Sequence, residues 1–237
     1  MSIYQGLLQV QEHDTAVDRL RYRRDTLPEA ARLEDVGNKI AAIEATLERT
    51  GERRDAVARV QRRVEDELGN VEDKIKDLDV RLYSGEVTVI RELQALQADA
   101  ESLRRRRSSL EDEVLEAMTE REPIDEELRA LESERDRLDG EGAELRAAIA
   151  EAQANIDAEL SAELEARAEA TTHIPDDLMA LYEKIRAQED GIGAAALVNG
   201  RCGGCHLALP ATELDRMKRE PPDALVRCEQ CGRVLVR

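Results

Sequence analysis

Phenylalanine and tryptophan are absent from this chain, and aromatic residues make up only 2% of its 237 residues. Charged residues, by contrast, account for 37% of the sequence. Large aromatic side chains supply much of the buried area in most globular cores, and this chain has almost none to offer. The composition therefore argues against an ordinary globular core of this length.

Several sequence signals of function are also missing. No apolar stretch is long enough to cross a membrane, no lipidation motif is present, and the first residues lack the basic and apolar regions of a secretion signal. We therefore expect a soluble, cytoplasmic protein. The chain has neither a P-loop nor a dinucleotide-binding fingerprint, and its three histidines (His13, His173 and His206) stand far apart. The many carboxylates are typical of a solvated helical surface, so we expect no catalytic activity.

What the chain does have is a long seven-residue repeat. One apolar register runs from Leu33 to Leu82, and a second, three residues on, runs from Val36 to Leu78. A similar register continues from Leu96 to Leu145. Sustained heptads predict a coiled coil. The expected fold class is mainly α, with a long antiparallel coiled-coil hairpin followed by a small C-terminal β zinc ribbon.

The two heptad segments are separated by a turn sequence near residues 83–88. Gly85 permits a chain reversal, and Thr88 is suited to cap the following helix. A symmetrical hairpin about this turn pairs residues whose numbers add up to about 172. That register places the arginines at 104–107 opposite the acidic residues 65–67, and it brings Arg53 and Arg54 near Glu116 and Glu120. The arginine run is thus explained by pairing between helices, with a phosphate-binding patch as the alternative.

Helix-breaking residues fall at matching heights on the two arms of this hairpin. Pro123 lies opposite Thr50 and Gly51, and Pro28 lies opposite residues 140–142, which include two glycines. We therefore expect two local kinks or hinges.

The only four cysteines form two pairs with the spacing of metal-binding turns, Cys202 with Cys205 and Cys228 with Cys231. Two such turns together provide the tetrahedral sulfur cage that a structural Zn²⁺ prefers, so we expect one bound Zn²⁺. Such a site is closed and leaves no position to activate water. The alternatives are haem attachment through the C-x-x-C-H string, a redox dithiol, disulfides, and His206 in place of one sulfur ligand.

The segment boundaries follow from these patterns. The hairpin occupies residues 1–170, a linker and a short helix occupy 171–193, and the zinc ribbon occupies 194–237. Asp176 and Asp177 begin the short helix, whose apolar face includes Leu178, Tyr182 and Ile185.

The charge distribution limits where nucleic acid could bind. From Leu197 onward there are seven basic and five acidic residues, a balance of +2, so the rest of a chain with net charge -18 carries -20. An acidic hairpin repels phosphates, and contact with nucleic acid is expected only at the ribbon. The candidate contact residues there, for nucleic acid or a protein partner, are Arg216, Lys218, Arg219, Arg227 and Arg233.

With hairpin, turn and ribbon assigned, the chain resembles the bacterial C4-type zinc-ribbon family with a long N-terminal coiled-coil hairpin. The matching strings are Leu82-Tyr-Ser-Gly-Glu-Val-Thr88, Glu92-Leu-Gln-Ala-Leu-Gln97, Leu110-Glu-Asp-Glu-Val-Leu-Glu116, and the ending Cys228-x-x-Cys231-Gly-Arg-Val-Leu235. The chain departs from the family at Val89-Ile90, where an Asn-Pro-like pair is common. The resemblance implies a noncatalytic scaffold, with the four cysteines as zinc ligands, that binds an alternative sigma factor and in some members messenger RNA.

Two hypotheses for function result. The first is a zinc-binding coiled-coil adaptor that holds a protein partner in transcription or translation, with Tyr83, Val87, Val89 and Ile90 as candidate contact residues at the hairpin tip. The second is direct RNA or DNA binding through the basic residues of the ribbon. A redox switch at the cysteines is a third reading. We expect a monomer or a dimer.

Overall fold

The computed structural model describes residues 3–221 and 224–237, and the chain divides into two compact units. One unit combines the described residues up to Arg32 with Leu145–Arg237, and the other is formed by Leu33–Glu144. The two longest helices, α2 (Pro28–Tyr83) and α3 (Ile90–Thr171), contribute to both units. No helix in the described ranges combines the length and the apolarity needed to cross a membrane.

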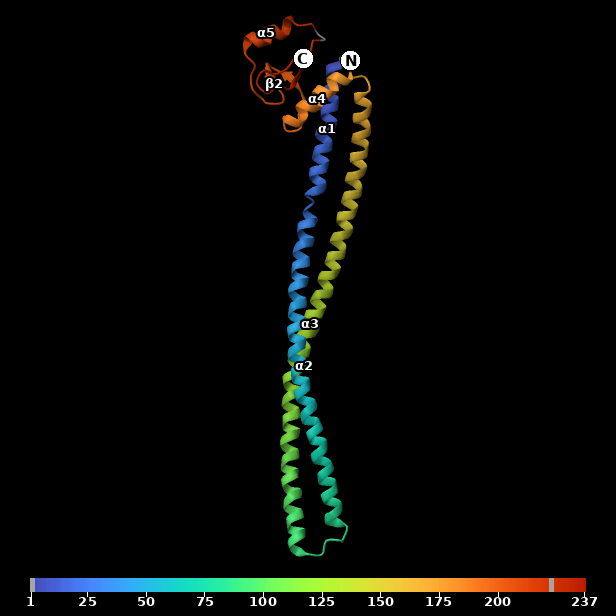
Figure 1. Ribbon diagram of the computed structural model, residues 1–237, viewed down its shortest axis with the longest axis vertical. Coiled ribbons are helices and arrows are strands. Elements are labelled where there is room, and N and C mark those ends of the chain that lie inside the picture. The colour runs from blue at the N-terminus through green and yellow to red at the C-terminus, as the bar shows by residue number, and fades with distance from the viewer. Residues whose placement is uncertain (1–2, 222–223) are drawn as a thin grey trace. The chain divides into compact units, whose positions relative to one another are not determined.

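The unit at residues 33–144 is an antiparallel coiled-coil hairpin, as the heptads predict. Figure 1 shows α2 and α3 running side by side and joined by one connection. The buried centre of the packing consists of Val64, Val71, Ile75 and Leu110, and Leu68, Leu103 and Val114 pack against it. Six of these residues occupy the predicted heptad registers and Val114 flanks the register of α3, because a 3.5-residue repeat keeps one stripe of each helix facing the other.

The register of this hairpin differs from the symmetrical one. Arg53 pairs with Glu127 and Arg54 with Asp125, each at 3.4 Å, so facing residues add up to 180 and 179 rather than 172. Arg53 does line one surface hollow with Glu120, as predicted, but its ion pair is with Glu127, and the predicted pairing partners lie about one heptad from the observed ones. The reason lies at the tip, where the first turns of α3 extend past the end of α2 (Figure 1).

The arginine run at 104–107 shows both predicted and different pairings. Arg106 does pair with Glu67, at 2.9 Å, as predicted. Arg104 instead pairs with Asp79 at 2.8 Å, and Arg107 pairs with an acidic residue of its own helix. Pairing between helices thus accounts for two of the four arginines, and a third is paired within α3.

The turn between the helices is built around Gly85, which has a φ of 78°. Ser84 stabilises it, because its Oγ donates to the carbonyl of Arg81 and accepts from the N–H of Glu86. The expected cap at Thr88 is not formed. Helix α3 begins at Ile90, one residue later than a Thr88 cap requires, and it is the carbonyl of Val89 that accepts the first helical hydrogen bonds.

The predicted breaks have mixed outcomes. Pro28 is the first residue of α2 and follows a two-residue interruption, a position where the missing N–H has no cost. Gly51 lies inside α2, and Pro123 and residues 140–142 lie inside α3, where the helical conformation continues. Pro123 removes one backbone hydrogen bond, yet α3 continues across it.

The unit built from both chain ends surrounds a small sheet with helices. It contains α1 (Ile3–Asp25), α4 (Asp176–Gln188) and α5 (Ala211–Arg219), together with the ends of the two long helices. The strands β1 (Ala194–Val198), β2 (Arg201–Cys202) and β3 (Val234–Val236) are arranged in the order β2-β1-β3. Strand β1 is antiparallel to β2 and parallel to β3, so the sheet joins the beginning and the end of the ribbon.

The two faces of this sheet belong to two different cores. Ala194 and Val234 face the helices, in a cluster with Leu7 and Val10 of α1 and Tyr182 of α4. Their neighbours Ala195 and Leu235 face the other way, toward the cysteines and α5. Side chains alternate along a strand, so each residue step changes the core that is contacted.

Candidate metal centre

The two cysteine pairs lie on two turns with the same backbone design. In the first turn the N–H of His206 donates to the carbonyl of Cys202, and in the second the N–H of Gly232 donates to the carbonyl of Cys228, both at 2.8 Å. His206 and Gly232 both have a positive φ, 62° and 73°. This left-handed residue closes the loop and leaves both sulfurs on one side. His206 therefore has a backbone role, and its exposed side chain lies outside the sulfur cluster.

The four sulfurs form a cage of the right size for zinc. Their atoms all lie within 4.8 Å of one another. The Sγ atoms of Cys202 and Cys231 are 3.9 Å apart, as are those of Cys205 and Cys228. A tetrahedral ion with Zn–S bonds of about 2.3 Å requires an S–S separation of about 3.8 Å, whereas a disulfide requires about 2.05 Å. The ribbon therefore holds one structural Zn²⁺ through its four cysteines.

The protein environment shifts the pKa values of the cysteine thiols in different directions. Burial raises the pKa of Cys202, and it raises the pKa of Cys228 to about 12. Burial acts in the same direction on Cys231, but hydrogen bonds from the backbone N–H and the guanidinium of Arg233 outweigh it, so the pKa of Cys231 is lowered. A bound Zn²⁺ supplies the positive charge that keeps all four sulfurs as thiolates.

Arg233 corrects one expectation from the sequence. It was a candidate contact for nucleic acid, but its side chain is only 7% exposed. Its guanidinium donates to the carbonyls of Ile192 and Glu189, at 3.0 and 2.8 Å, and it pairs with the Glu189 carboxylate at 3.2 Å. All of its donor groups point into the protein, so Arg233 is not available to a phosphate.

The other basic candidates remain on the ribbon surface. Arg216 pairs with Glu229 at 2.9 Å, and Lys218 pairs with Asp215 at 3.3 Å. Arg227 donates to the carbonyl of Gly232. Arg219, at the end of α5, is exposed and has no ion pair among the described residues.

The ribbon is fixed to the helices by the side-chain amide of Gln11, which is buried on α1. Its oxygen accepts from the N–H of Gly193 at 2.7 Å, and its nitrogen donates to the carbonyl of Gly191 at 2.9 Å. Gly193 is required here, because a Cβ would lie 2.6 Å from the ring of Tyr182. The Gln11 amide thus binds the backbone of Gly191 and Gly193, just before β1.

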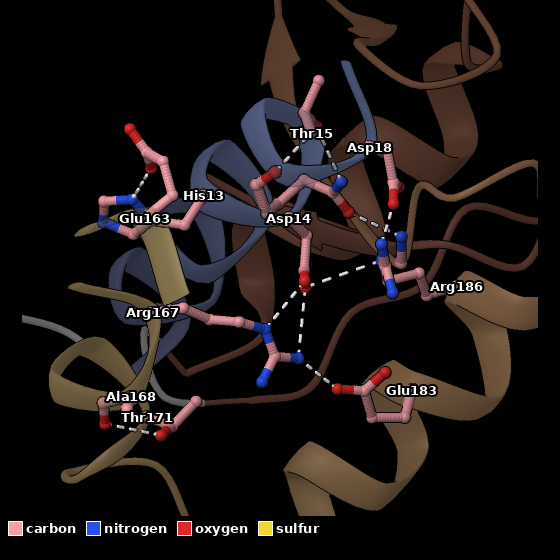
Figure 2. A network of polar contacts seen from close by, with 12 residues as sticks. His13, Asp14, Thr15, Asp18, Glu163, Arg167, Ala168, Thr171, Glu183 and Arg186 are labelled. Carbon is pink, nitrogen blue, oxygen red and sulfur yellow. Dashed lines mark hydrogen bonds and ion pairs between the residues drawn. The ribbon is translucent and has the colours of Figure 1, made fainter. Parts of the chain in front are cut away.

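A buried carboxylate continues this anchor, as Figure 2 shows. Asp14 accepts hydrogen bonds from the Tyr182 hydroxyl and from Arg167 Nε, both at 2.7 Å, and Arg186 Nε lies 3.6 Å away. Arg167 also pairs with Glu183. Burial, and then the nearby Asp14, raise the pKa of Tyr182, so its hydroxyl stays protonated as a donor. Three helices therefore converge on one charge.

Sequence reasoning missed Gln11 and Asp14, although a signal was present. Both are buried with Leu7, Val10 and Val17 on one stripe of α1. Polar residues inside an apolar stripe of a helix indicate buried hydrogen-bonded partners.

The candidate residues at the hairpin tip are largely solvent-exposed. Tyr83 is 85% exposed, Ile90 74% and Val89 58%, while Val87 is half-buried. Val80, one turn before Tyr83, adds another exposed apolar side chain at 69%.

Comparison with known proteins assigns the family. Residues 10–190 match the CT398-like coiled coil hairpin domain, and residues 201–235 match the C4-type zinc ribbon domain. An uncharacterized protein of Mycobacterium tuberculosis is 31% identical over 239 residues, which cover 98% of this chain and 94% of that protein.

Two solved structures share the fold. A protein from Mycobacterium smegmatis is 27% identical with a TM-score of 0.87, and all of each chain is covered. CT398 from Chlamydia trachomatis, at 20% identity, has a TM-score of 0.66, covering 99% of this chain and 97% of its own. The hairpin match spans most of the sequence and the four-sulfur site lies in the second matched segment, so this chain belongs to the CT398-like coiled-coil hairpin family and carries that family's hairpin together with a C4-type zinc ribbon.

Proposed function

We propose that this protein is a noncatalytic adaptor whose coiled-coil hairpin binds a protein partner in gene expression, such as a sigma factor. The single observation that carries this proposal is the exposed apolar group at the hairpin tip. Tyr83, Val89 and Ile90 are all more than half exposed although each is large and apolar. Exposed apolar groups of this kind mark surfaces that bind proteins.

The chemistry of the zinc centre supports a role without catalysis. Four sulfur ligands close the coordination sphere, so the ion has no position for a substrate or a water. The ion instead stabilises a fold that buries little apolar area of its own.

Affinity purification from the source cells, with and without nuclease, tests this proposal. The test variant is the tip double substitution Tyr83→Ser with Ile90→Ser, and the control is Leu115→Ser, which alters a residue that is 60% exposed elsewhere on α3. We expect a defined protein to be retained after nuclease treatment, and the tip variant to lose it by roughly tenfold or more. Equal retention by the tip variant and the control would contradict a partner site at the tip.

Direct nucleic-acid binding through the ribbon is the second candidate, and exposed Arg219 and Arg227 favour it. The ion pairs of Arg216 and Lys218 weaken it, because phosphate binding requires cations that are free to displace counterions. Changing Arg216, Lys218 and Arg219 to Glu would abolish such binding and leave capture of a partner by the hairpin intact. RNA and DNA binding measured at two salt concentrations distinguishes the two functions, because only the second predicts a steep salt dependence.

A further inference from the structure

Arg233 connects both metal-binding turns to the chain segment before β1. Its backbone carbonyl accepts the N–H of Cys228 at 2.9 Å, which fixes the start of the second turn. Its aliphatic stem lies against the first turn, since a Cβ on Gly204 would be 2.5 Å from the Arg233 Cδ. Its guanidinium holds the carbonyls of Glu189 and Ile192. The position of this one side chain therefore depends on both turns being formed.

The segment at residues 189–193 is also bound by α1. Gln11 binds the carbonyl of Gly191 and the N–H of Gly193 with a single amide. The carbonyl of Gly193 in turn accepts the N–H of Val234, the residue after Arg233. Gln11 and Arg233 thus bind different backbone groups of the same five residues, and β3 is hydrogen-bonded to the last of these residues.

Apolar contacts follow the same route. Leu7 and Val10 of α1 are completely buried, in a cluster that includes Ala194 and Val234 of the sheet. The opposite face of that sheet packs on Cys202 and Cys228. If the metal is lost, the core on the cysteine face is no longer held together by the ion. The sheet that packs on Leu7 and Val10 is then no longer packed on its opposite face.

We infer that Gln11 and Arg233 are positioning residues of the zinc site, and that zinc binding in turn holds α1 in place. The metal and the N-terminal helix are coupled in this way whatever partner the protein binds. Coupling between two sites is reciprocal, so the factor by which bound zinc favours the docking of α1 is also the factor by which a docked α1 raises zinc affinity. Gln11 is not a ligand and lies far from the cysteines in sequence, which makes its effect on zinc a direct test.

The first experiment uses the full wild-type chain and measures hydrogen exchange before and after zinc removal by a chelator. We expect amides of residues 7–17 to exchange at least tenfold faster without zinc, because their docking surface is lost. Amides of residues 60–80, in the other compact unit, serve as the internal control and stay unchanged. If the ribbon opens and the exchange of α1 stays the same, the inference is overturned.

The second experiment measures zinc affinity by competition with a chromophoric chelator, and records the Co²⁺ spectrum as a readout of the sulfur geometry. Partners of metal ligands typically contribute 10- to 100-fold in affinity, so we expect Arg233→Ala to lie in that range and Gln11→Ala near its lower end, about tenfold. Arg233→Lys keeps the charge and the stem but loses the planar fork, so it restores part of the affinity and keeps the chain folded if alanine does not.

Matched controls on α1 and on the ribbon give the effect of a substitution at an exposed position. Glu12→Ala changes the exposed neighbour of Gln11 on α1, and Arg219→Ala removes an exposed arginine of the ribbon. Both should bind zinc within about twofold of the wild type. An affinity of Gln11→Ala that matches Glu12→Ala would also overturn the inference.

Discussion

Replacing Asp14 with alanine should destabilise the unit built from the two chain ends by about 3 kcal/mol. The carboxylate is only 4% exposed, and it is shared by Arg167, Tyr182 and Arg186. Removing one partner of a buried ion pair costs about 3 to 5 kcal/mol, because the remaining charge is left without compensation.

Two contacts of the remaining partners place the expected cost of Asp14→Ala at the lower end of the range for a buried ion pair. Arg167 is 22% exposed at its side chain and keeps its contact with Glu183, so water and one carboxylate remain available to it. Tyr182 keeps a hydrogen bond to the Gln11 oxygen at 3.2 Å. Tyr182→Phe, which removes a single hydroxyl and leaves the ion pairs of Asp14 intact, should cost about 1 kcal/mol.

Urea unfolding followed by hydrogen exchange in α1 and α4 is the suitable assay, because it reports on this unit alone. Asp18→Ala is the matched control. Asp18 is an acidic residue on the same helix that pairs with Arg186, but it is 45% exposed and should contribute at most about 1 kcal/mol. A cost for Asp14→Ala no greater than that of Asp18→Ala would refute the view that this network anchors the helices.

Further substitutions test the other parts of the molecule. Cys228→Ser should bring metal content from about one zinc per chain to near zero, with the circular dichroism of the hairpin retained. Leu110→Ala, at a fully buried seam position, should cost about 2 to 5 kcal/mol in urea unfolding, and a value below that range would contradict the described packing. Gly193→Ala should destabilise the ribbon because its Cβ would overlap Tyr182. Gly140→Ala, with open space around it, should stabilise α3 by about 0.5 to 1 kcal/mol. Melting curves in which Gly193→Ala is more stable than Gly140→Ala would exclude this reasoning.

The hairpin and the metal ligands could be predicted from sequence because each has a periodic or fixed-spacing signal. A seven-residue repeat placed Val64 and Leu110 in the seam, and the C-x-x-C spacing identified the ligands. The register could not be predicted in the same way. It depends on how far α3 extends past the end of α2, and turn composition does not encode that offset.

The anchor of the ribbon was harder to predict for a different reason. Arg233 and Arg219 are the same residue type in the same ribbon, yet Arg233 is buried and Arg219 is exposed. The difference arises because the 189–192 turn offers two carbonyls to Arg233, and that contact joins segments over 40 residues apart. Contacts of this kind have no local signal in a single sequence.

The parallel pairing of β1 with β3 has a consequence for synthesis of the protein. Leu7 and Val10 of α1 pack in a cluster with Val234, which is synthesised more than 220 residues after them. At about 5 to 20 residues per second, the apolar stripe of α1 waits on the order of 10 to 45 s for its partner. A premature stop before β3 would leave this stripe without the part of its cover that Val234 supplies.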